Sequence, residues 1–457
     1  MNDQAAHRTF PLSSVKSASI SLPWRFYSVE ALASAGTNLM VSGIYFYTAD
    51  AFHWNLRQNF LLATGQGLVY VVGALLANAI GRRMGKNSAL TMVYSAMSAI
   101  ALLACFCADR PATVTALLLG YSFCSAIGWP LMESLVSTGV DSHALSRRIS
   151  IYNVVWAGVG ALMLAIEGTL IVHWPAGVFL LPAVAHAVSA LAIWTPRAED
   201  GPAPAARRAA TPRHGDADIG EGEPLPAATS VTESGHSRIC TSSSDGPEPE
   251  LLRVRTLALW LSRSVLPATY VAIFSLMALM PSLPVMQQIG EESRTLLSST
   301  WMATRLLAFL LLGFGTWWHT RPRVLLVAAF IMLGAFFGVT VRPSDLFAHG
   351  SAHLDLCLMI GAQLALGAAL GMIYSASLYF GMVLSDGSAE HGGYHEALIG
   401  IGFILGPGSG ALAQWAFPTH GVNAGIYAVG GVVAMSVIIV ALMSLRAGEK
   451  EVNAQKQ

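Results

Sequence analysis

The chain has 457 residues, of which 54% are hydrophobic and only 11% are charged, and its formal net charge is zero. Soluble domains carry roughly a quarter of charged residues, so this composition excludes an ordinary soluble protein and predicts an integral membrane protein. The few Lys and Arg residues stand at the ends of apolar runs and not in a cluster, which excludes a nucleic-acid-binding surface.

Residues 1–25 form a polar tail that lacks the order of a cleaved secretory signal, so we expect it to be retained. Residues 26–195 then contain six apolar runs. Runs of roughly 20 apolar residues must be helical in lipid, because hydrocarbon offers no partner for an unpaired backbone amide. The predicted helices are 26–49, 58–81, 88–107, 112–139, 150–172 and 175–195.

Residues 196–254 are rich in Pro, Ala, Gly and Ser and contain few large apolar side chains. Such a segment buries too little surface to offset the entropy of ordering, so it is predicted to be a disordered linker. A flexible tether is the simpler interpretation, and a regulatory or partner-binding segment is the alternative.

Six further apolar runs fill residues 255–446, and a short tail follows over 447–457. The predicted helices are 256–284, 295–318, 322–341, 354–384, 394–416 and 423–445. The predicted fold class is therefore an all-α polytopic membrane protein with twelve transmembrane helices in two six-helix bundles.

Short basic loops predict the orientation, because cationic loops stay on the cytoplasmic side. With the N-terminus inside, the cytoplasmic loops carry most of the basic pairs, and we expect both termini and the linker in the cytoplasm of a multi-pass cell-membrane protein, such as one of a bacterial inner membrane. The basic residues are Arg82, Arg83, Lys86, Arg147, Arg148, Arg321, Arg323, Arg446 and Lys450.

The two halves also look related. Similar short motifs occur at comparable places in each, as an internal duplication requires, and two repeated bundles are typical of a transporter with its site at their interface. The matching segments are 128–130 with 371–373, 152–153 with 394–395, and 81–83 with 321–323.

Residues 74–86, ALLANAIGRRMGK, form a basic turn after the second predicted helix. The turn resembles the pattern G-x-L-a-D-r-x-G-r-r that the major facilitator superfamily carries between its second and third helices. With its six-plus-six helices and central linker, the chain as a whole also resembles this superfamily. Gly81, Arg82 and Arg83 match the pattern, whereas Asn78 replaces the acidic residue. The resemblance implies a cytoplasmic gate that Asn78 weakens, with Glu133 as a candidate partner for Arg82. A basic loop without a gating role is the alternative.

A second family pattern, G-x-x-x-G-P-x-x-G-G, belongs to the fifth helix of some antiporters. Here its nearest likeness lies in the eleventh predicted helix, at Gly402, Gly406 and Pro407. Small residues at this spacing usually allow helices to approach closely, so export is not inferred.

The resemblance implies that helices one, four, seven and ten line a central cavity. Their aromatic and polar residues are then candidates for contact with a partly apolar organic solute. Interfacial aromatic belts and helix packing are the alternative explanations. The candidates are Asn38, Tyr45, Tyr121, Trp129, Arg263, Tyr270, Tyr374, Ser375, Ser377 and Tyr379.

Charged residues at membrane depth are a stronger signal, because inserting one costs at least about 2.5 to 3.5 kcal/mol unless it is paired or hydrated. Arg305 and Arg263 therefore should face water, an anionic substrate or a carboxylate. A buried carboxyl group can take up a proton in one conformation and release it in another, which suits proton coupling; a fixed ion pair is the alternative. Glu133 is the first candidate and Glu30 the second, followed by Glu167 and Asp50.

Two histidines, His391 and His395, stand four residues apart in the run 390–396. Gly392 and Gly393 should break the helix that would place them on one face, so we expect a loop and no metal site. Such a loop is a candidate for a pH-sensitive hinge.

These observations predict a secondary transporter that moves a small organic solute by alternating access, with a proton gradient as the expected driving force. The chain lacks a G-x-x-x-x-G-K-[ST] loop for ATP. We expect no cofactor, no enzymatic activity, a monomer, and membrane lipid and a small-molecule substrate as partners. A transport-incompetent sensor or assembly scaffold, and a membrane-embedded enzyme acting on lipid-linked substrates, are the alternatives.

Overall fold

Long apolar helices make up nearly all of the described chain. The computed structural model describes residues 24–138, 142–194, 249–342, 344, 351–385 and 387–454, and within these ranges every regular element is a helix. Most of the predicted linker, up to residue 248, lies outside the described residues.

The first half contains α1 (Trp24–Thr37), the π-helix η1 (Asn38–Ser42), α2 (Ile44–Ala51), α3 (Leu56–Met84), α4 (Lys86–Phe106), α5 (Pro111–Ser137), α6 (Ser142–His173) and α7 (Gly177–Trp194). Local signals fix several ends. Asn55 and Gln58 form a capping box before α3, with bonds of 3.1 and 2.9 Å, and Pro111 opens α5.

The second half contains α9 (Pro249–Leu279), η2 (Met280–Ser282), α10 (Pro284–Gln287), α11 (Glu291–Ser298), α12 (Thr300–Phe314), η3 (Trp317–Thr320), α13 (Arg323–Thr340), α15 (Ala352–Ser385), α16 (Ala389–Ala416), η4 (Pro418–His420) and α17 (Val422–Ala454). Helix α9 begins before the predicted bundle start at residue 255, and α17 runs past the predicted bundle end at residue 446.

Eleven helical segments of the described chain are long and apolar enough to cross a membrane. The predicted span 26–49 is not among them, because it is divided into α1, η1 and α2 with a break at Gly43. These three segments still traverse the bundle in succession. Arg25 at the start of α1 donates to the carbonyl of Ala192 near the end of α7, whereas Asp50 lies with the far end of α6.

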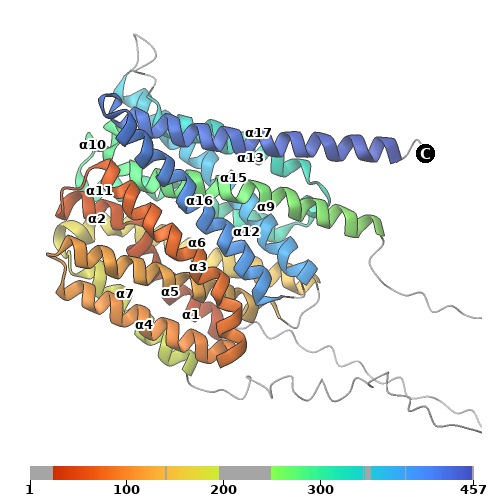
Figure 1. Cartoon of the computed structure of the whole chain (residues 1–457), viewed down its shortest axis with the longest axis horizontal. Coiled ribbons are helices and arrows are strands. Elements are labelled where there is room, and N and C mark those ends of the chain that lie inside the picture. Colours follow the sequence, from red (N-terminus) through yellow and green to blue (C-terminus); the bar gives the residue numbers. More distant parts are fainter. Residues whose placement is uncertain are drawn as a thin grey trace, which may run out of the picture.

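Each half packs mainly on itself, and the two halves lie side by side (Figure 1). Helix α3 packs on α16 and helix α6 on α11 and α12, so these pairs join the halves. We call the face at which α1 begins and α17 ends the terminal face, and the other the opposite face.

Glycines bring α3 and α16 close together along much of their length. A Cβ atom at Gly67 would lie 2.8 Å from the backbone nitrogen of Ile404, and one at Gly393 would lie 2.9 Å from the carbonyl oxygen of Ala74. Any side chain at either position would force the two backbones apart.

Helix α16 runs without a break through Gly392 and Gly393, so the prediction of a loop there was wrong. The hydroxyl of Ser388 caps the helix by accepting the amide of Glu390 at 3.2 Å. Gly392 lies against Pro130 of α5, where a Cβ atom would be 3.2 Å from the Pro130 Cα. Close packing between the halves therefore offsets the low helix propensity of glycine, about 1 kcal/mol per residue.

Candidate functional site

A central cavity of about 100 Å³ lies between the two halves. Residues of both halves line it, and most of them are aromatic or carry a hydrogen-bonding group. They include Asn38, Tyr70, Trp129 and Trp156 from the first half and Tyr270, Arg305, Tyr374 and Glu396 from the second.

Arg305 is the only cation that lines this cavity in the described part of the chain. It lies on α12, is only 2% exposed, and donates from Nη2 to the hydroxyl of Tyr270 at 3.1 Å. Its guanidinium carbon lies 4.6 Å from the ring centroid of Trp156 and 4.9 Å from that of Tyr374. Cation–π contacts stabilise this charge only in part, by about 0.5 to 2 kcal/mol each.

No described carboxylate forms an ion pair with Arg305, and its Nε atom has no hydrogen-bond partner there. A buried charge without a carboxylate in direct contact costs several kcal/mol, even after local relaxation. The protein therefore keeps an expensive positive charge at its centre, facing the space in which a solute would bind.

Two carboxyl groups, one from each half, meet beside the same cavity. Glu133 on α5 and Glu396 on α16 are each 2% exposed, and one oxygen of each lies within 4.8 Å of the other. Two negative charges at that distance repel by about 3 to 4 kcal/mol at an effective dielectric constant of about 20. The pair is therefore most stable when it holds at least one proton.

Tyrosine hydroxyls support the two carboxyl groups. Tyr70 on α3 donates to Glu396 Oε2 at 2.5 Å, and Tyr374 on α15 donates to Glu133 Oε1 over a longer 3.4 Å. Each of these bonds crosses between the halves. The acid pair is therefore hydrogen-bonded to side chains of both bundles.

His395 completes this cluster. Its Nδ1 atom lies 3.0 Å from the hydroxyl of Ser377, and its Nε2 atom has no partner among the described residues. Glu133, His395 and Glu396 each offer one ligand atom within 4.8 Å of the others, so they are the residues that could hold a metal ion. The positive charge of Arg305 in the adjoining cavity disfavours a divalent cation there, and the same atoms suit a shared proton.

Five of the predicted site residues line the central cavity: Asn38, Trp129, Arg305, Tyr270 and Tyr374. Asn38 stands at the start of η1, where its side-chain oxygen accepts the hydroxyl of Ser42 at 3.1 Å. Trp129 donates from its indole nitrogen to Ser125 at 3.0 Å. Glu133 adjoins this group through Tyr374.

The other predicted cavity residues lie elsewhere. Tyr45 donates to Gln66 at 2.8 Å inside the first half, and the hydroxyl of Tyr121 lies 2.5 Å from Nε2 of His186 on α7. Arg263 is half-buried beside Gly381 of α15, where its Nη2 would lie 3.4 Å from a Cβ atom. Ser375 is buried within α15, and Tyr379 lies in a groove at the terminal face.

Glu30 and Glu167, the remaining predicted carboxyl groups, are both fully buried in the first half. Glu30 accepts the hydroxyl of Ser34 at 2.8 Å. Neither oxygen of Glu167 has a hydrogen-bond partner in the described chain, and the carboxyl group occupies the space that a side chain at Gly43 would need.

The predicted gate residues Asn78, Arg82 and Arg83 line a pocket of about 600 Å³ at the terminal face, together with Glu390. Gly81 lies beside them, packed against the side chain of Leu131. The predicted pairing of Arg82 with Glu133 does not occur, because the Glu133 side chain points inward toward Glu396. Glu390 is the acidic residue that shares the pocket with Arg82.

A second terminal-face groove contains His319 of η3, which stacks on Tyr379 with ring centroids 4.1 Å apart. Burial and, to a smaller extent, the nearby charge of Arg255 lower the pKa of His319 to about 4. This histidine is therefore neutral at physiological pH.

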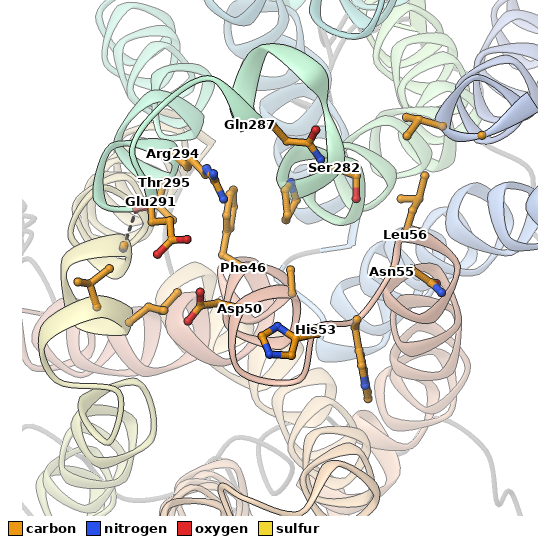
Figure 2. A pocket seen from close by; sticks show the side chains of 18 of the residues that line it. Phe46, Asp50, His53, Asn55, Leu56, Ser282, Gln287, Glu291, Arg294 and Thr295 are labelled. Atoms are coloured by element: carbon orange, nitrogen blue, oxygen red, sulfur yellow. Dashed lines mark hydrogen bonds between the residues drawn. The ribbon is translucent and has the colours of Figure 1, made fainter.

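The opposite face has a pocket of about 660 Å³. Figure 2 shows that Asp50 from α2 and Glu291 and Arg294 from α11 face its opening. Thr295 on its wall accepts the backbone amide of Gly168 at 2.7 Å, which joins the halves at this end. The central cavity therefore has a smaller volume than the pockets at the two faces.

A family model, that of the Major Facilitator Superfamily, matches residues 27–407. The chain belongs to this superfamily. Two solved structures, those of the nucleoside transporter NupG and of a point mutant of it, are similar to this chain at 12% and 11% sequence identity, each with a TM-score of 0.59. Each match covers 93% of this chain and 99% of the other. No curated protein matches the sequence.

Membership confirms the predicted all-α transporter fold, and members of this superfamily are typically not enzymes. The sequence had nevertheless missed Glu396, Tyr70 and Trp156. Glu396 could have been found from its charge within an apolar run, had the two glycines before it not indicated a loop. Nothing in the sequence marked Tyr70 or Trp156, because their helices were not expected to line the cavity.

Proposed function

We propose that this protein is a proton-coupled secondary transporter that moves a small organic solute across a cell membrane by alternating access. One observation carries the proposal: two buried carboxyl groups, Glu133 and Glu396, come from opposite halves and meet beside the central cavity. Any movement that separates the halves on this side must also separate this pair.

The acid pair links the movement to the proton as follows. While the halves are closed over it, the pair holds a proton, because two unscreened negative charges would repel by several kcal/mol. When the halves part at the terminal face, water reaches both groups and solvates their charges. The O–H bond then breaks, the proton passes to water, and each carboxylate keeps its electron pair.

Orientation of the protein follows from its basic residues. Arg82, Arg83 and Arg147 lie in pockets of the terminal face, and cationic loops stay on the cytoplasmic side. We therefore assign the terminal face to the cytoplasm and the pocket of Asp50 and Arg294 to the outside.

The test begins by finding a solute. A thermal-shift screen of the purified full chain would use metabolites and drugs and would include nucleosides, since the similar solved structures are of a nucleoside transporter. Uptake of a stabilising solute into proteoliposomes is then measured with and without an imposed pH gradient. We expect the gradient to drive uptake, and Glu133→Gln or Glu396→Gln to remove that drive.

The matched control is Asp109→Asn, since Asp109 is exposed on a loop far from the acid pair. It should behave as the parent protein does. Uptake that ignores the pH gradient in the parent would contradict proton coupling, and the absence of any flux would favour the sensor or scaffold alternative. Asn78, which replaces the acidic residue of the family turn, is the observation that supports that alternative.

A further inference from the structure

The position of Arg305 bears on which solute the cavity accepts. Its side chain faces a cavity in which it is the only cation, with no carboxylate in ion-pair contact among the described residues. An arginine cannot lose its proton, so the charge persists through every state of the protein. The group that would complete the site is an anion.

The remaining walls indicate the rest of the ligand. The rings of Trp156, Tyr270 and Tyr374 surround the guanidinium, and Trp129 and Phe274 line the same space. Flat apolar walls of this kind suit an apolar ligand body. Asn38 and Ser42 provide polar groups on the side of the first half.

The volume of the cavity limits the size of the ligand. The closed cavity measures about 100 Å³, whereas a cavity of about 150 Å³ takes one benzene molecule. A single guanidinium also matches one carboxylate in a two-bond arrangement. These observations favour a monocarboxylate with a short apolar chain, and a ligand with one ring would require the cavity to widen.

We infer that the central cavity binds a small organic monocarboxylate, whose charged group pairs with Arg305 and whose apolar body lies against the aromatic walls. This inference rests on the proposed transport function and names its substrate class.

Glu396 makes the binding of the anion depend on a proton. It is the only carboxyl group that lines the cavity in the described structure, so it is the counter-charge available to Arg305 when no solute is bound. A bound anion takes over that role. Glu396 then loses its electrostatic support and binds a proton, and by thermodynamic linkage a proton on Glu396 favours the anion. Anion and proton should therefore bind together.

The experiment compares acids with their uncharged amides, which have nearly the same shape. Binding of benzoate and benzamide, nicotinate and nicotinamide, and butyrate and butyramide to the full chain in lipid nanodiscs is measured by calorimetry. We expect at least one acid to bind about tenfold or more tightly than its amide. The comparison uses the parent protein, so it does not depend on whether a variant folds.

Variants then test whether Arg305 causes the preference for the acid over its amide. Arg305→Gln should abolish it, Arg305→Lys should retain part of it, and Arg57→Gln, at an exposed position near the start of α3, should leave it unchanged. Calorimetry in buffers of different ionisation enthalpy should show uptake of about one proton per anion. Glu396→Gln should bind the acid without that uptake.

Equal binding of acid and amide in every pair, no binding by any of the six probes, or a preference that survives Arg305→Gln would overturn the inference. Failure of the proposed function looks different. If a neutral solute is driven by the pH gradient while no acid is preferred, the transporter stands and the anion site does not. If an acid is preferred but no solute moves, the anion site stands and the transporter does not.

Discussion

The two ends of the contact between the halves differ in how deeply their charged groups are buried. Toward the terminal face, Glu133, His395 and Glu396 are buried and packed against the partner half. At the opposite face, Asp50, Glu291 and Arg294 surround an open pocket. The exposed side chains of His173 and Glu292 meet there at 2.8 Å and form an ion pair when the histidine is protonated.

This difference determines at which end a movement of the halves changes the solvation free energy of the charged groups. Exposed ion pairs contribute about 0 to 1 kcal/mol, because water already solvates each partner. Buried groups change their free energy by several kcal/mol when water reaches them. A movement of the halves is therefore coupled strongly to charge at the terminal end and weakly at the opposite end.

The largest effect is expected at the centre, between these two ends. Arg305→Ala should reduce solute affinity by about 30-fold to several-thousand-fold, since removing one partner of a buried charge pair costs about 2 to 5 kcal/mol. Uptake into proteoliposomes measures it, and size-exclusion chromatography verifies that the variant inserts and folds. Unchanged uptake would remove Arg305 from the mechanism.

The next effect tests the terminal end directly. In the parent protein, uptake should rise by up to about tenfold for each pH unit of gradient, the limit for one coupled proton. Glu396→Gln should make this dependence flat while exchange of solute across the membrane continues. A slope that persists in both Glu396→Gln and Glu133→Gln would place the coupling group outside the acid pair.

Glu167 sharpens the comparison, because it is buried like the acid pair but its carboxyl group points into the first half, against Gly43. Its two oxygens lack partners in the described chain, and such groups cost about 1 to 3 kcal/mol. Glu167→Met should therefore raise the apparent unfolding midpoint by a few degrees and leave uptake intact. Glu133→Met should also stabilise the protein, but at the expense of its pH response. Differential scanning fluorimetry measures the first effect and proteoliposome uptake the second.

His319 provides a smaller, pH-dependent test at the terminal face. Its pKa of about 4 in the folded protein is below the ordinary value of 6.5, so the unfolded chain binds a proton more readily. Its contribution to stability is complete above pH 6.5 and is lost as the pH falls from 6.5 toward 4. The midpoint of the parent should decrease over this window more than that of His319→Gln. If the midpoints of the parent and of His319→Gln decrease equally with pH, protonation of His319 does not affect stability.

The smallest effect is expected at the opposite face. His173→Gln breaks the exposed pair with Glu292 and should change stability by less than about 0.5 kcal/mol and uptake by less than about twofold. Melting curves and uptake assays on the same preparation measure both. A loss comparable to that of Glu396→Gln would show that the two ends are not as different as their burial indicates.

The sequence predicts the fold well, because lipid imposes a simple requirement on apolar runs. It also singles out Arg305 and Glu133 as candidates, since a charge within an apolar run is a visible signal. It does not predict which side of a lining helix faces the cavity. Tyr121 and Trp129 lie on the same helix, yet the first contacts His186 of α7 and the second lines the cavity.

The same limit explains Glu396. Local propensity indicates a break at Gly392 and Gly393, whereas contact with α3 and α5 keeps α16 helical and places Glu396 beside Glu133. Such pairings depend on contacts between residues far apart in the chain. They emerge only once the halves are placed together.

The glycine-lined approach of α3 and α16 constrains how the protein changes shape. At Gly67 and Gly393 no side chain stands between the two backbones, so the helices touch closely at both points. Small changes in the angle between α3 and α16 therefore meet little steric resistance. Separating the two helices would instead expose the backbone at these glycines to lipid. We therefore expect this glycine-lined contact to act as a pivot about which one half tilts against the other while the two helices stay in contact.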